Sequence, residues 1–310
     1  MNRLLILSAD ARKYLALINA ANLPQLEIVT ACDAVPVEAA ACNIILGDPG
    51  LAGQVIESAR QLEWLQSTWA GVNSLCGEGL RRDYVLTGVK GVFGPLVSEY
   101  VITYLFAYER QLFTMRRNQL EQRWQRLPYR HSRDITVGIV GLGSIGKHLA
   151  RTIHQFGIRV KGLSRSGSPC DDVEKVYTEE NISGFFEELD YVVLALPDTQ
   201  ETRNFINAER LGMMKPSAIL MNVGRGSTVN ETDLVCAISE NAIGGAVLDV
   251  FAHEPLAKDS PLWTLPGVVV TPHNSAISFP EDVVAIFTEN YRRFLRHDPL
   301  LHVVDFESGY

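Results

Sequence analysis

Short apolar runs alternate with amphipathic segments along most of the chain. In the first hundred residues the apolar runs are RLLILSA, LEIVTA, CNIILGD and EWLQST, and each of them predicts a strand. Between the first two lies DARKYLALINAA, whose apolar residues recur with helical spacing. Because strands that alternate with helices usually pair in parallel, this part of the chain predicts a small α/β unit.

A second series of apolar runs begins at TVGIVGLGSIG and continues through RVKGLSR, YVVLALP, AILMNVG, GGAVLDV and GVVVTPH. Their near-continuous Val, Ile and Leu content is typical of strands that are covered on both faces. Residues 94–125, between the two series, carry the longest helical pattern and predict one helix that links two domains. A last helix, from about Pro280 to Arg296, is expected to pack back onto the first unit.

Length and composition agree with two unlike α/β lobes separated by a cleft. The chain has 310 residues, of which 46% are hydrophobic and 21% charged, as in ordinary globular proteins. Its formal net charge of −8 argues against a nucleic acid or an anionic membrane as partner. No apolar run approaches the length of about 18 residues that a membrane-spanning helix needs. We therefore expect neither kind of partner.

The cysteines indicate the redox environment. There are five of them, widely spaced and without a C-x-x-C pair: Cys32, Cys42, Cys76, Cys170 and Cys236. This pattern favours free thiols in a reducing compartment over a disulfide framework or a zinc site. We expect a cytoplasmic protein without a bound metal.

The segment TVGIVGLGSIGKHLARTI contains a dinucleotide-binding fingerprint. Gly141, Gly143 and Gly146 stand in the G-x-G-x-x-G spacing between a predicted strand and a predicted helix. In such a loop the first glycine permits the tight turn, the second lets the pyrophosphate approach, and the third allows the helix to contact the strand. The helix N-terminus then offers unpaired N–H groups to the phosphates. The alternative is a structural turn without a ligand.

The end of the next predicted strand bears on the choice of nucleotide. An NAD-binding chain carries an acidic residue here for the ribose hydroxyls, but the first acid after Gly146 is Asp171, which lies too far along. Ser164, Arg165 and Ser166 instead supply a guanidinium and two hydroxyls, which suit a 2′-phosphate. NADP(H) is therefore favoured over NAD(H). The alternative interpretation is a solvated loop in which Arg165 contacts nothing.

Three polar residues follow successive predicted strands in the C-terminal half: Arg225, Glu254 and His273. The carboxyl ends of parallel strands open onto the crevice where ligands bind. Arg225 would hold a carboxylate or polarise a carbonyl, and His273 would donate a proton with a carboxylate beside it. This set suits the reduction of a 2-oxo acid. Taken singly, each residue also has an ordinary explanation as a cap, a turn residue or a surface ion pair.

The motifs GLGSIG, LALPDTQETRNFIN, NVGRGSTVNETDL, GAVLDVFAHEPL and VVVTPHNSA occur in the order typical of one family. Over nearly its whole length the chain resembles the D-2-hydroxyacid dehydrogenases. The resemblance implies a homodimeric oxidoreductase with two α/β domains. A Rossmann-type doubly wound parallel sheet, residues 99–279, would be inserted into a flavodoxin-like substrate domain formed by residues 1–98 and 280–310.

The resemblance also implies roles for matching residues. Arg225 would bind the substrate's carboxylate and carbonyl oxygen, His273 would be the acid/base, and Glu254 its partner. Asp249 would hydrogen-bond the nicotinamide carboxamide. The remaining candidates for cofactor contact are Ser144, Ile145, Leu196, Pro197, Thr202 and Val223. In STWAGVNSL, the substrate-binding candidates are Trp69, Ala70 and Gly71. The amides of Ala70 and Gly71 would receive the substrate carboxylate, whereas Trp69 would line the pocket or belong to the core.

The segments SRS and DVFAHEPLAKDSPLW resemble the glyoxylate/hydroxypyruvate reductase branch of this family. We therefore expect NADPH-dependent reduction of a small 2-oxo acid to the D-2-hydroxy acid. One alternative is NAD-dependent oxidation of a small anion such as phosphite or formate, against which the missing acid counts. Another is a non-catalytic, nucleotide-sensing interaction protein, which would not need an intact proton relay.

Overall fold

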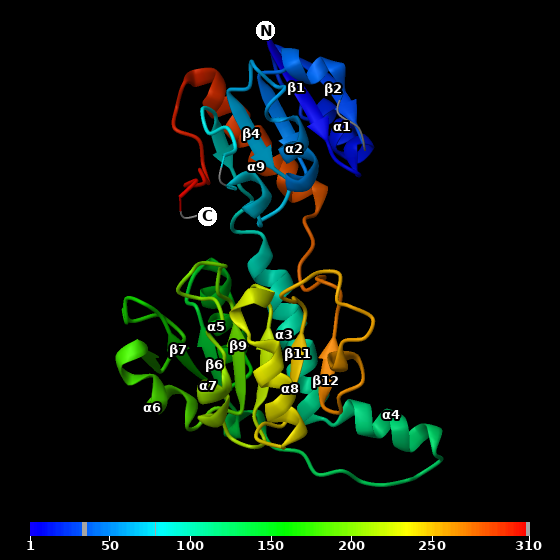
Figure 1. The fold of residues 1–310 in the computed structure, drawn as a ribbon, viewed down its shortest axis with the longest axis vertical. Helices are drawn as coiled ribbons and strands as arrows, with labels where there is room; N and C mark the ends of the chain where they lie inside the picture. Colours follow the sequence, from blue (N-terminus) through cyan, green and yellow to red (C-terminus); the bar gives the residue numbers. More distant parts are fainter. Residues whose placement is uncertain (33–35, 78, 308–310) are drawn as a thin grey trace. The chain divides into compact units, whose positions relative to one another are not determined.

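The computed structural model describes residues 1–32, 36–77 and 79–307, and they form two compact units (Figure 1). Unit 1 comprises Met1–Val92 and Ser278–Tyr310, and unit 2 comprises Phe93–Ile277. The sequence led us to expect the changes of domain after residues 98 and 279. Each unit contains a parallel sheet with helices, so the predicted fold class is confirmed.

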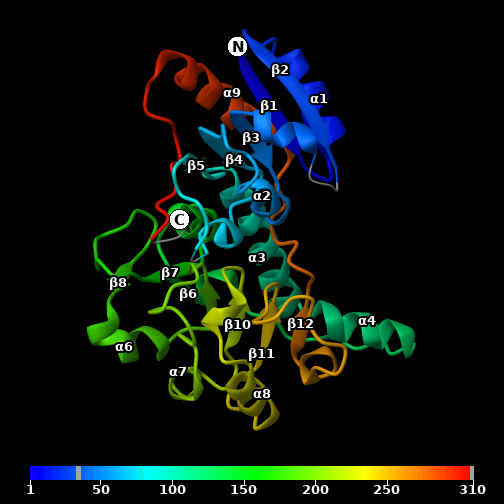
Figure 2. The ribbon, with the colours of Figure 1, turned by 45° about the horizontal axis from the view of Figure 1, so that its top comes forward.

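Unit 1 is built on a five-stranded parallel sheet in the order β2-β1-β3-β4-β5 (Figure 2). This order is the one found in flavodoxin-like folds. Its strands are β1 (Asn2–Leu7), β2 (Leu26–Ala31), β3 (Ile44–Gly47), β4 (Trp64–Ser67) and β5 (Val85–Thr87), and its α-helices are α1 (Ala11–Ala20), α2 (Pro49–Val55) and α9 (Pro280–Arg296).

The last helix of the chain, α9, completes the core of unit 1. Trp64, fully buried in β4, stacks on Phe287 of α9 with ring centroids 5.0 Å apart, and Phe294 packs on the same ring. The hydroxyl of Tyr291 donates to the carbonyl of Pro24, just before β2. The prediction that a helix from Pro280 to Arg296 returns to the first unit is therefore confirmed.

Unit 2 is built on a seven-stranded parallel sheet in the order β12-β11-β10-β9-β6-β7-β8. Its strands are β6 (Thr136–Val140), β7 (Arg159–Leu163), β8 (Lys175–Tyr177), β9 (Tyr191–Leu194), β10 (Ile219–Asn222), β11 (Gly245–Leu248) and β12 (Val268–Val270). Its α-helices are α3 (Phe93–Glu109), α4 (Leu112–Leu120), α5 (Ser144–Gln155), α6 (Ile182–Phe186), α7 (Ala208–Gly212) and α8 (Glu231–Ser239). The strand order reverses direction between β6 and β9, and in such sheets ligands bind beyond the carboxyl ends of the strands at this point.

Helices cover both faces of the sheet in unit 2. On one face α3 and α5 bury apolar residues such as Val101 and Leu149 against the strands. On the other face α6, α7 and α8 do the same with residues such as Phe185 and Leu234. This double cover explains why these strands are almost purely apolar in sequence. No helix in the described ranges combines the length and apolar character needed to cross a lipid bilayer.

Two strands were not predicted from the sequence. β5 and β8 are three residues long and lie at the edges of their sheets. β12 is equally short but consists of three valines, whereas the segments VLT of β5 and KVY of β8 form no continuous apolar run.

The prediction of a single helix over residues 94–125 is wrong. The chain forms α3, breaks at Gln111, whose φ of 51° is left-handed, and resumes as α4, which ends at Leu120. The Gln111 side chain donates to the carbonyl of Pro128 in the returning segment, a contact that an uninterrupted helix would not make. Both ribbon views show α4 projecting away from the sheet of unit 2 (Figures 1 and 2).

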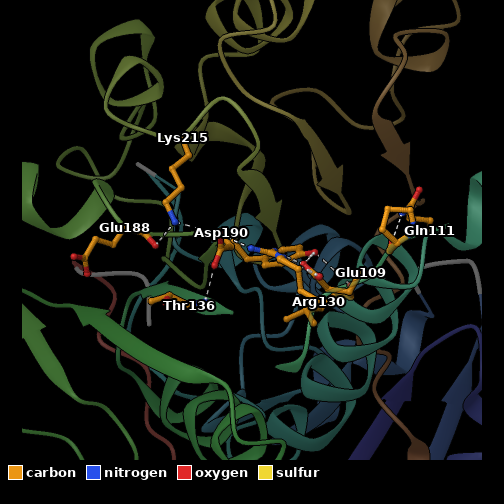
Figure 3. A network of polar contacts seen from close by, with 10 residues as sticks. Glu109, Gln111, Arg130, Thr136, Glu188, Asp190 and Lys215 are labelled. Carbon is orange, nitrogen blue, oxygen red and sulfur yellow. Dashed lines mark hydrogen bonds and ion pairs between the residues drawn. The ribbon is translucent and has the colours of Figure 1, made fainter. Parts of the chain in front are cut away.

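An ionic network around two buried carboxylates, Glu109 and Asp190, holds the segment that returns from α4 (Figure 3). The Arg130 guanidinium donates from Nε to Glu109 at 3.2 Å and from Nη1 to Asp190 at 2.9 Å. Asp190 also accepts from Lys215 at 3.2 Å and from the Thr136 N–H at 2.8 Å. Burial by itself raises the pKa of Asp190, but these donors outweigh it and the net pKa is lowered. Arg130 therefore joins the end of α3 to the start of β9.

We expect Arg130→Met to lower the free energy of unfolding by about 2 kcal/mol, because two largely buried carboxylates lose a charged donor. The lowered pKa of Asp190 stabilises the fold above its unfolded value of 3.8, and this stability disappears as the pH falls through the folded value. The difference between the proteins should therefore shrink in acid. Urea denaturation at pH 7 and pH 3.5 measures it, with Arg133→Met, at an exposed position, as the control. Equal stabilities of all three proteins at pH 7 would contradict the role of the network.

Candidate active site

The loop between β6 and α5 carries the three predicted glycines. Gly141 has a φ of +98°, and its N–H donates to the carbonyl of Leu163 at 2.9 Å. A Cβ on Gly146 would lie 2.0 Å from the carbonyl oxygen of Gly141, so α5 can approach β6 this closely only with glycine there. The tight turn brings the N-terminus of α5 directly over the end of β6.

The same loop fits the pyrophosphate of a dinucleotide. Gly143 is exposed at the N-terminus of the 12-residue helix α5, and a Cβ built on it meets no atom within 4 Å. Ser144 is exposed and Ile145 half-buried in the first turn, where backbone N–H groups lack carbonyl partners within the helix. Open space at Gly143 beside a helix N-terminus suits an anionic phosphate.

The loop after β7 holds the residues considered for a 2′-phosphate. Ser164 is half-buried and its N–H donates to the carbonyl of Tyr177 at 3.0 Å, whereas Arg165 and Ser166 are exposed. A hydrogen bond from Thr199 is the main cause of the lowered pKa of Glu201, and the charge of Arg165 contributes. The positive charge of Arg165 thus acts on the loop after β9.

The loop after β9 is closed by Thr202. Its hydroxyl donates to the carbonyl of Pro197 at 2.6 Å and accepts from the N–H of Thr199 at 2.9 Å. Leu196 is half-buried before this turn, and Val223 is buried after β10. The predicted contacts from this loop to a cofactor stay predictions.

Arg225 follows β10 and is held close to the chain that follows β11. Its Nη1 donates to the carbonyl of Gly224 at 2.7 Å. A Cβ on the next residue, Gly226, would lie 1.8 Å from the carbonyl carbon of Phe251, so this contact requires glycine. Burial lowers the pKa of Arg225, and the charges of Glu254 and Asp198 oppose that shift. The guanidinium is a poorly hydrated cation, which favours binding of an anion.

His273 and Glu254 form the expected pair. Nδ1 of His273 lies 2.8 Å from Oε2 of Glu254, and the Glu254 Oε1 atom accepts from the N–H of Phe251 at 3.0 Å. The side chain of His273 is 50% exposed, so its other ring nitrogen can reach a ligand. A carboxylate at Nδ1 fixes the ring's orientation and leaves Nε2 for proton exchange.

A cavity of about 260 Å³ brings the predicted catalytic residues together. Its lining consists of Asp198, Arg225, Gly226, Ser227, Val250, Phe251, Ala252, Glu254 and His273. All of these residues belong to unit 2 and follow the carboxyl ends of β9, β10, β11 and β12. A guanidinium and a carboxylate–imidazole pair therefore share one cavity.

Two polar residues of this cavity, Asp198 and Ser227, were not predicted from the sequence. The Asp198 carboxylate accepts from the Ser227 hydroxyl at 2.9 Å and from Nε of Arg203 at 3.1 Å. Burial by itself raises the pKa of Asp198, but these donors and the charge of Arg225 leave it lowered. Both residues stand in motifs that the sequence shows, LPDTQET and GRGST. Their closeness in sequence to Pro197 and Arg225 is the signal that could have identified them.

Asp249 organises the loop that carries His273. Its carboxylate is fully buried and accepts from the Thr271 hydroxyl at 2.6 Å and from the N–H groups of Asn274 and Ser275, each at 2.9 Å. Its predicted bond to a nicotinamide carboxamide stays a prediction.

The backbone of His273 is held in an unusual conformation. Its φ of 52° lies in the left-handed region, which costs a non-glycine residue about 1 kcal/mol or more. The His273 N–H donates to the carbonyl of Asp249 at 2.9 Å, which helps to hold this conformation. The conformation sets the direction of the imidazole, so it is part of the site.

The predicted substrate loop lies in unit 1. Trp69 is 56% exposed, which excludes it from the core, and Ala70 is exposed beside half-buried Gly71. The Ser67 hydroxyl donates to the carbonyl of Trp69 at 2.8 Å and fixes the turn after β4.

Comparison with known proteins identifies related sequences and folds. A family model described as D-isomer specific 2-hydroxyacid dehydrogenase, NAD binding domain, matches residues 102–275. A curated relative from Escherichia fergusonii, glyoxylate/hydroxypyruvate reductase A, is 32% identical over 260 residues, which are 82% of this chain and 83% of the relative.

Solved structures match both units. A D-isomer specific 2-hydroxyacid dehydrogenase family protein from Aeromonas salmonicida is 44% identical with a TM-score of 0.93, covering 98% of this chain and 99% of that one. An NADPH-dependent glyoxylate/hydroxypyruvate reductase from Sinorhizobium meliloti, solved in complex with NADP and sulfate, is 27% identical with a TM-score of 0.90 and complete coverage of both chains.

Proposed function

Because the chain belongs to the D-isomer specific 2-hydroxyacid dehydrogenase family, we propose that this oxidoreductase uses NADPH to reduce a small 2-oxo acid to the D-2-hydroxy acid. The observation that carries the proposal is the cavity shared by Arg225, Glu254 and His273. Glyoxylate and hydroxypyruvate are the substrates of choice, because relatives that cover most of the chain are named for them.

The cofactor would be held by loops at the carboxyl edge of the sheet in unit 2. Gly143 and the first turn of α5 would bind the pyrophosphate, with Gly141 and Gly146 allowing the close turn. Ser164, Arg165 and Ser166 would bind the 2′-phosphate of NADP(H). Leu196, Pro197, Thr202, Val223 and Asp249 complete the proposed cofactor contacts. When bound, the reduced nicotinamide supplies a hydride.

Arg225 would bind the substrate through its carboxylate and carbonyl oxygen. The guanidinium is half-buried, so its attraction for a substrate anion is screened less than it would be in open water. As negative charge develops on the carbonyl oxygen, a fixed cation beside it stabilises the transition state more than the ground state.

His273 would donate the proton that the carbonyl oxygen takes up. Glu254 at Nδ1 orients the ring and leaves Nε2 to donate the proton. In the oxidising direction the same nitrogen would accept the proton from the hydroxyl group of the product.

The turn after β4 in unit 1 supplies the remaining proposed substrate contacts. The exposed Ala70 and half-buried Gly71 would present backbone N–H groups to the substrate carboxylate, and Trp69 would line the pocket. Small residues suit this role because a short turn lets the backbone approach an anion closely.

One experiment distinguishes the proposed function from two alternative functions. A sensor protein would bind NADPH and oxidise none with any 2-oxo acid, and a phosphite or formate dehydrogenase would reduce NAD with those anions. Initial rates with glyoxylate, hydroxypyruvate and a phenyl-substituted 2-oxo acid, each with NADPH and NADH, separate the three functions.

We expect His273→Ala to lower kcat by about 100- to 10,000-fold, because the forming alkoxide loses its proton donor. The Kd for NADPH, measured by nucleotide fluorescence, should change less than about twofold. His253→Ala removes an exposed imidazole next to Glu254 and serves as the control, which should keep wild-type turnover. Wild-type kcat in His273→Ala would refute the assignment of His273.

Arg165→Asp should lower the ratio of kcat/KM with NADPH to that with NADH by about tenfold or more, because a charged donor is replaced by a carboxylate that repels the 2′-phosphate. Arg159→Asp makes the same change at the exposed start of β7 and should leave the ratio unaltered. If Arg165→Asp keeps the wild-type ratio, another group binds the 2′-phosphate.

A homodimer is the assembly we propose, and the projecting segment around α4 is its proposed contact. Exposed large apolar side chains gather there: Leu112, Phe113, Met115, Leu120, Trp124 and Tyr129. Such a concentration on one surface is typical of an interface.

The cytoplasmic location and the absence of a nucleic-acid partner stay predictions. All five cysteines are free thiols, which is the state that a reducing compartment favours.

Light scattering should give twice the mass of one chain for the native protein. Trp124→Glu places a charge on the proposed contact and should give single chains, because an unpaired buried carboxylate is costly. Trp263→Glu alters another exposed tryptophan of unit 2 and should remain dimeric. Dimers in both variants would place the interface elsewhere.

A further inference from the structure

Helix α3 is hydrogen-bonded to the loop of His273 through two hydroxyl groups. The Tyr100 hydroxyl lies 2.7 Å from the hydroxyl oxygen of Thr271, and the Thr271 hydroxyl donates to Asp249 at 2.6 Å. The Asp249 carboxylate in turn accepts from the N–H groups of Asn274 and Ser275. Tyr100 on α3 and Thr271 just after β12, neither of which has been given a role so far, are thus connected through Asp249 to the two residues that follow His273.

The direction of these hydrogen bonds follows from chemistry. A carboxylate only accepts, so Thr271 gives its single hydroxyl proton to Asp249. The Tyr100 hydroxyl must then donate to Thr271. Burial raises the pKa of Tyr100, which keeps that proton on the phenol, although the hydrogen bond to Thr271 acts in the opposite sense. The order of donation is therefore Tyr100 to Thr271 to Asp249.

The left-handed backbone conformation of His273 is held by hydrogen bonds to Asp249. Thr271 and Asn274, on its two sides, bind the same oxygen of Asp249, and the His273 N–H binds the carbonyl of that residue. These bonds together select the φ of 52° at His273. Loss of the Thr271 hydroxyl would leave the segment before His273 without its tie to the buried carboxylate.

We propose that Tyr100 and Thr271 are positioning residues for the reaction. Through the Asp249 carboxylate they fix the loop so that the His273 imidazole meets Glu254 and faces the cavity. Neither hydroxyl is required to touch the substrate. The inference rests on the proposed role of His273 as the proton donor.

Tyr108 provides an internal control on the same helix. Its hydroxyl donates to the carbonyl of Gly267 at 2.9 Å, immediately before β12, whereas Tyr100 binds Thr271, immediately after β12. Tyr100→Phe and Tyr108→Phe therefore remove the same group from opposite ends of one short strand. The loop of His273 follows the carboxyl end of β12, where Tyr100 binds, and not the amino end, where Tyr108 binds.

The test compares Thr271→Val, Thr271→Ser, Tyr100→Phe and Tyr108→Phe with the wild type in the full-length protein. With glyoxylate and NADPH, Thr271→Val should lower kcat by about 10- to 100-fold, as small misplacements of a reacting group do. Its KM for glyoxylate and Kd for NADPH should stay within about twofold, and Thr271→Ser should restore most of the turnover. Tyr100→Phe should lower kcat by about threefold or more, and Tyr108→Phe should keep it.

The combination of substitutions tests whether the two hydroxyls act in series. Tyr100→Phe should have almost no further effect in a protein that already carries Thr271→Val, because the acceptor of its proton is gone. If the losses of kcat from the two single substitutions multiply in the double variant, the two hydroxyls do not act in series. Equal losses of kcat in Thr271→Val and Tyr108→Phe, or failure of Thr271→Ser to restore turnover, would reduce Thr271 to a general stabilising role and overturn the proposal.

A readout that needs no turnover separates this inference from the proposed function. In protein labelled with ¹⁵N-histidine, the ring signals of His273, assigned with His273→Asn, should shift or broaden in Thr271→Val and remain in place in Tyr108→Phe. If the wild type reduces no 2-oxo acid, the proposed function fails, and these signals alone decide the positioning role. Unchanged His273 signals in Thr271→Val would overturn it whatever the activity.

Discussion

At the carboxyl edge of the seven-stranded sheet, neighbouring loops pack backbone against backbone. A side chain at Gly141 would collide with the carbonyl of Ala195, which follows the neighbouring strand β9, and one at Gly226 with the backbone of Phe251. Protein interiors tolerate little overlap, so such contacts fix the relative positions of the loops that make them. Arg225 and Glu254 therefore reach the same cavity because the chain segments that carry them are in direct contact. The chemistry of the site depends on this lack of freedom.

Within that frame, charges decide what the cavity can do. Arg225 is a half-buried cation, and the carboxylates of Asp198 and Glu254 act on it from nearby. Asp198 is itself occupied by Ser227 and Arg203, and Glu254 by His273 and a backbone N–H. The carboxylates thus support the guanidinium while each is engaged elsewhere. A cation held in this way remains available to an anionic ligand.

The sequence was most informative where local pattern determines structure. Long apolar runs predicted the central strands. Because a parallel sheet places the carboxyl ends of its strands along one edge, Arg225, Glu254 and His273, which follow such ends, were expected to lie close together. The pattern failed at Gln111, where a contact with Pro128 accompanies a break in an otherwise helical sequence. The pairing of Tyr100 with Thr271, 171 residues apart, has no local signal at all. Such contacts follow from tertiary packing, which overrides propensity.

The core of unit 1 combines segments that precede and follow unit 2 in the sequence. Trp64 stacks on Phe287 of α9, and the N–H of Val304 donates to the carbonyl of Leu86 in β5. During synthesis, roughly 200 residues separate the completion of β5 from the appearance of α9, which is roughly 10 to 40 s at the usual rate of elongation. All of unit 2 leaves the ribosome in that interval. The inserted unit can therefore fold before the unit that surrounds it in sequence is complete.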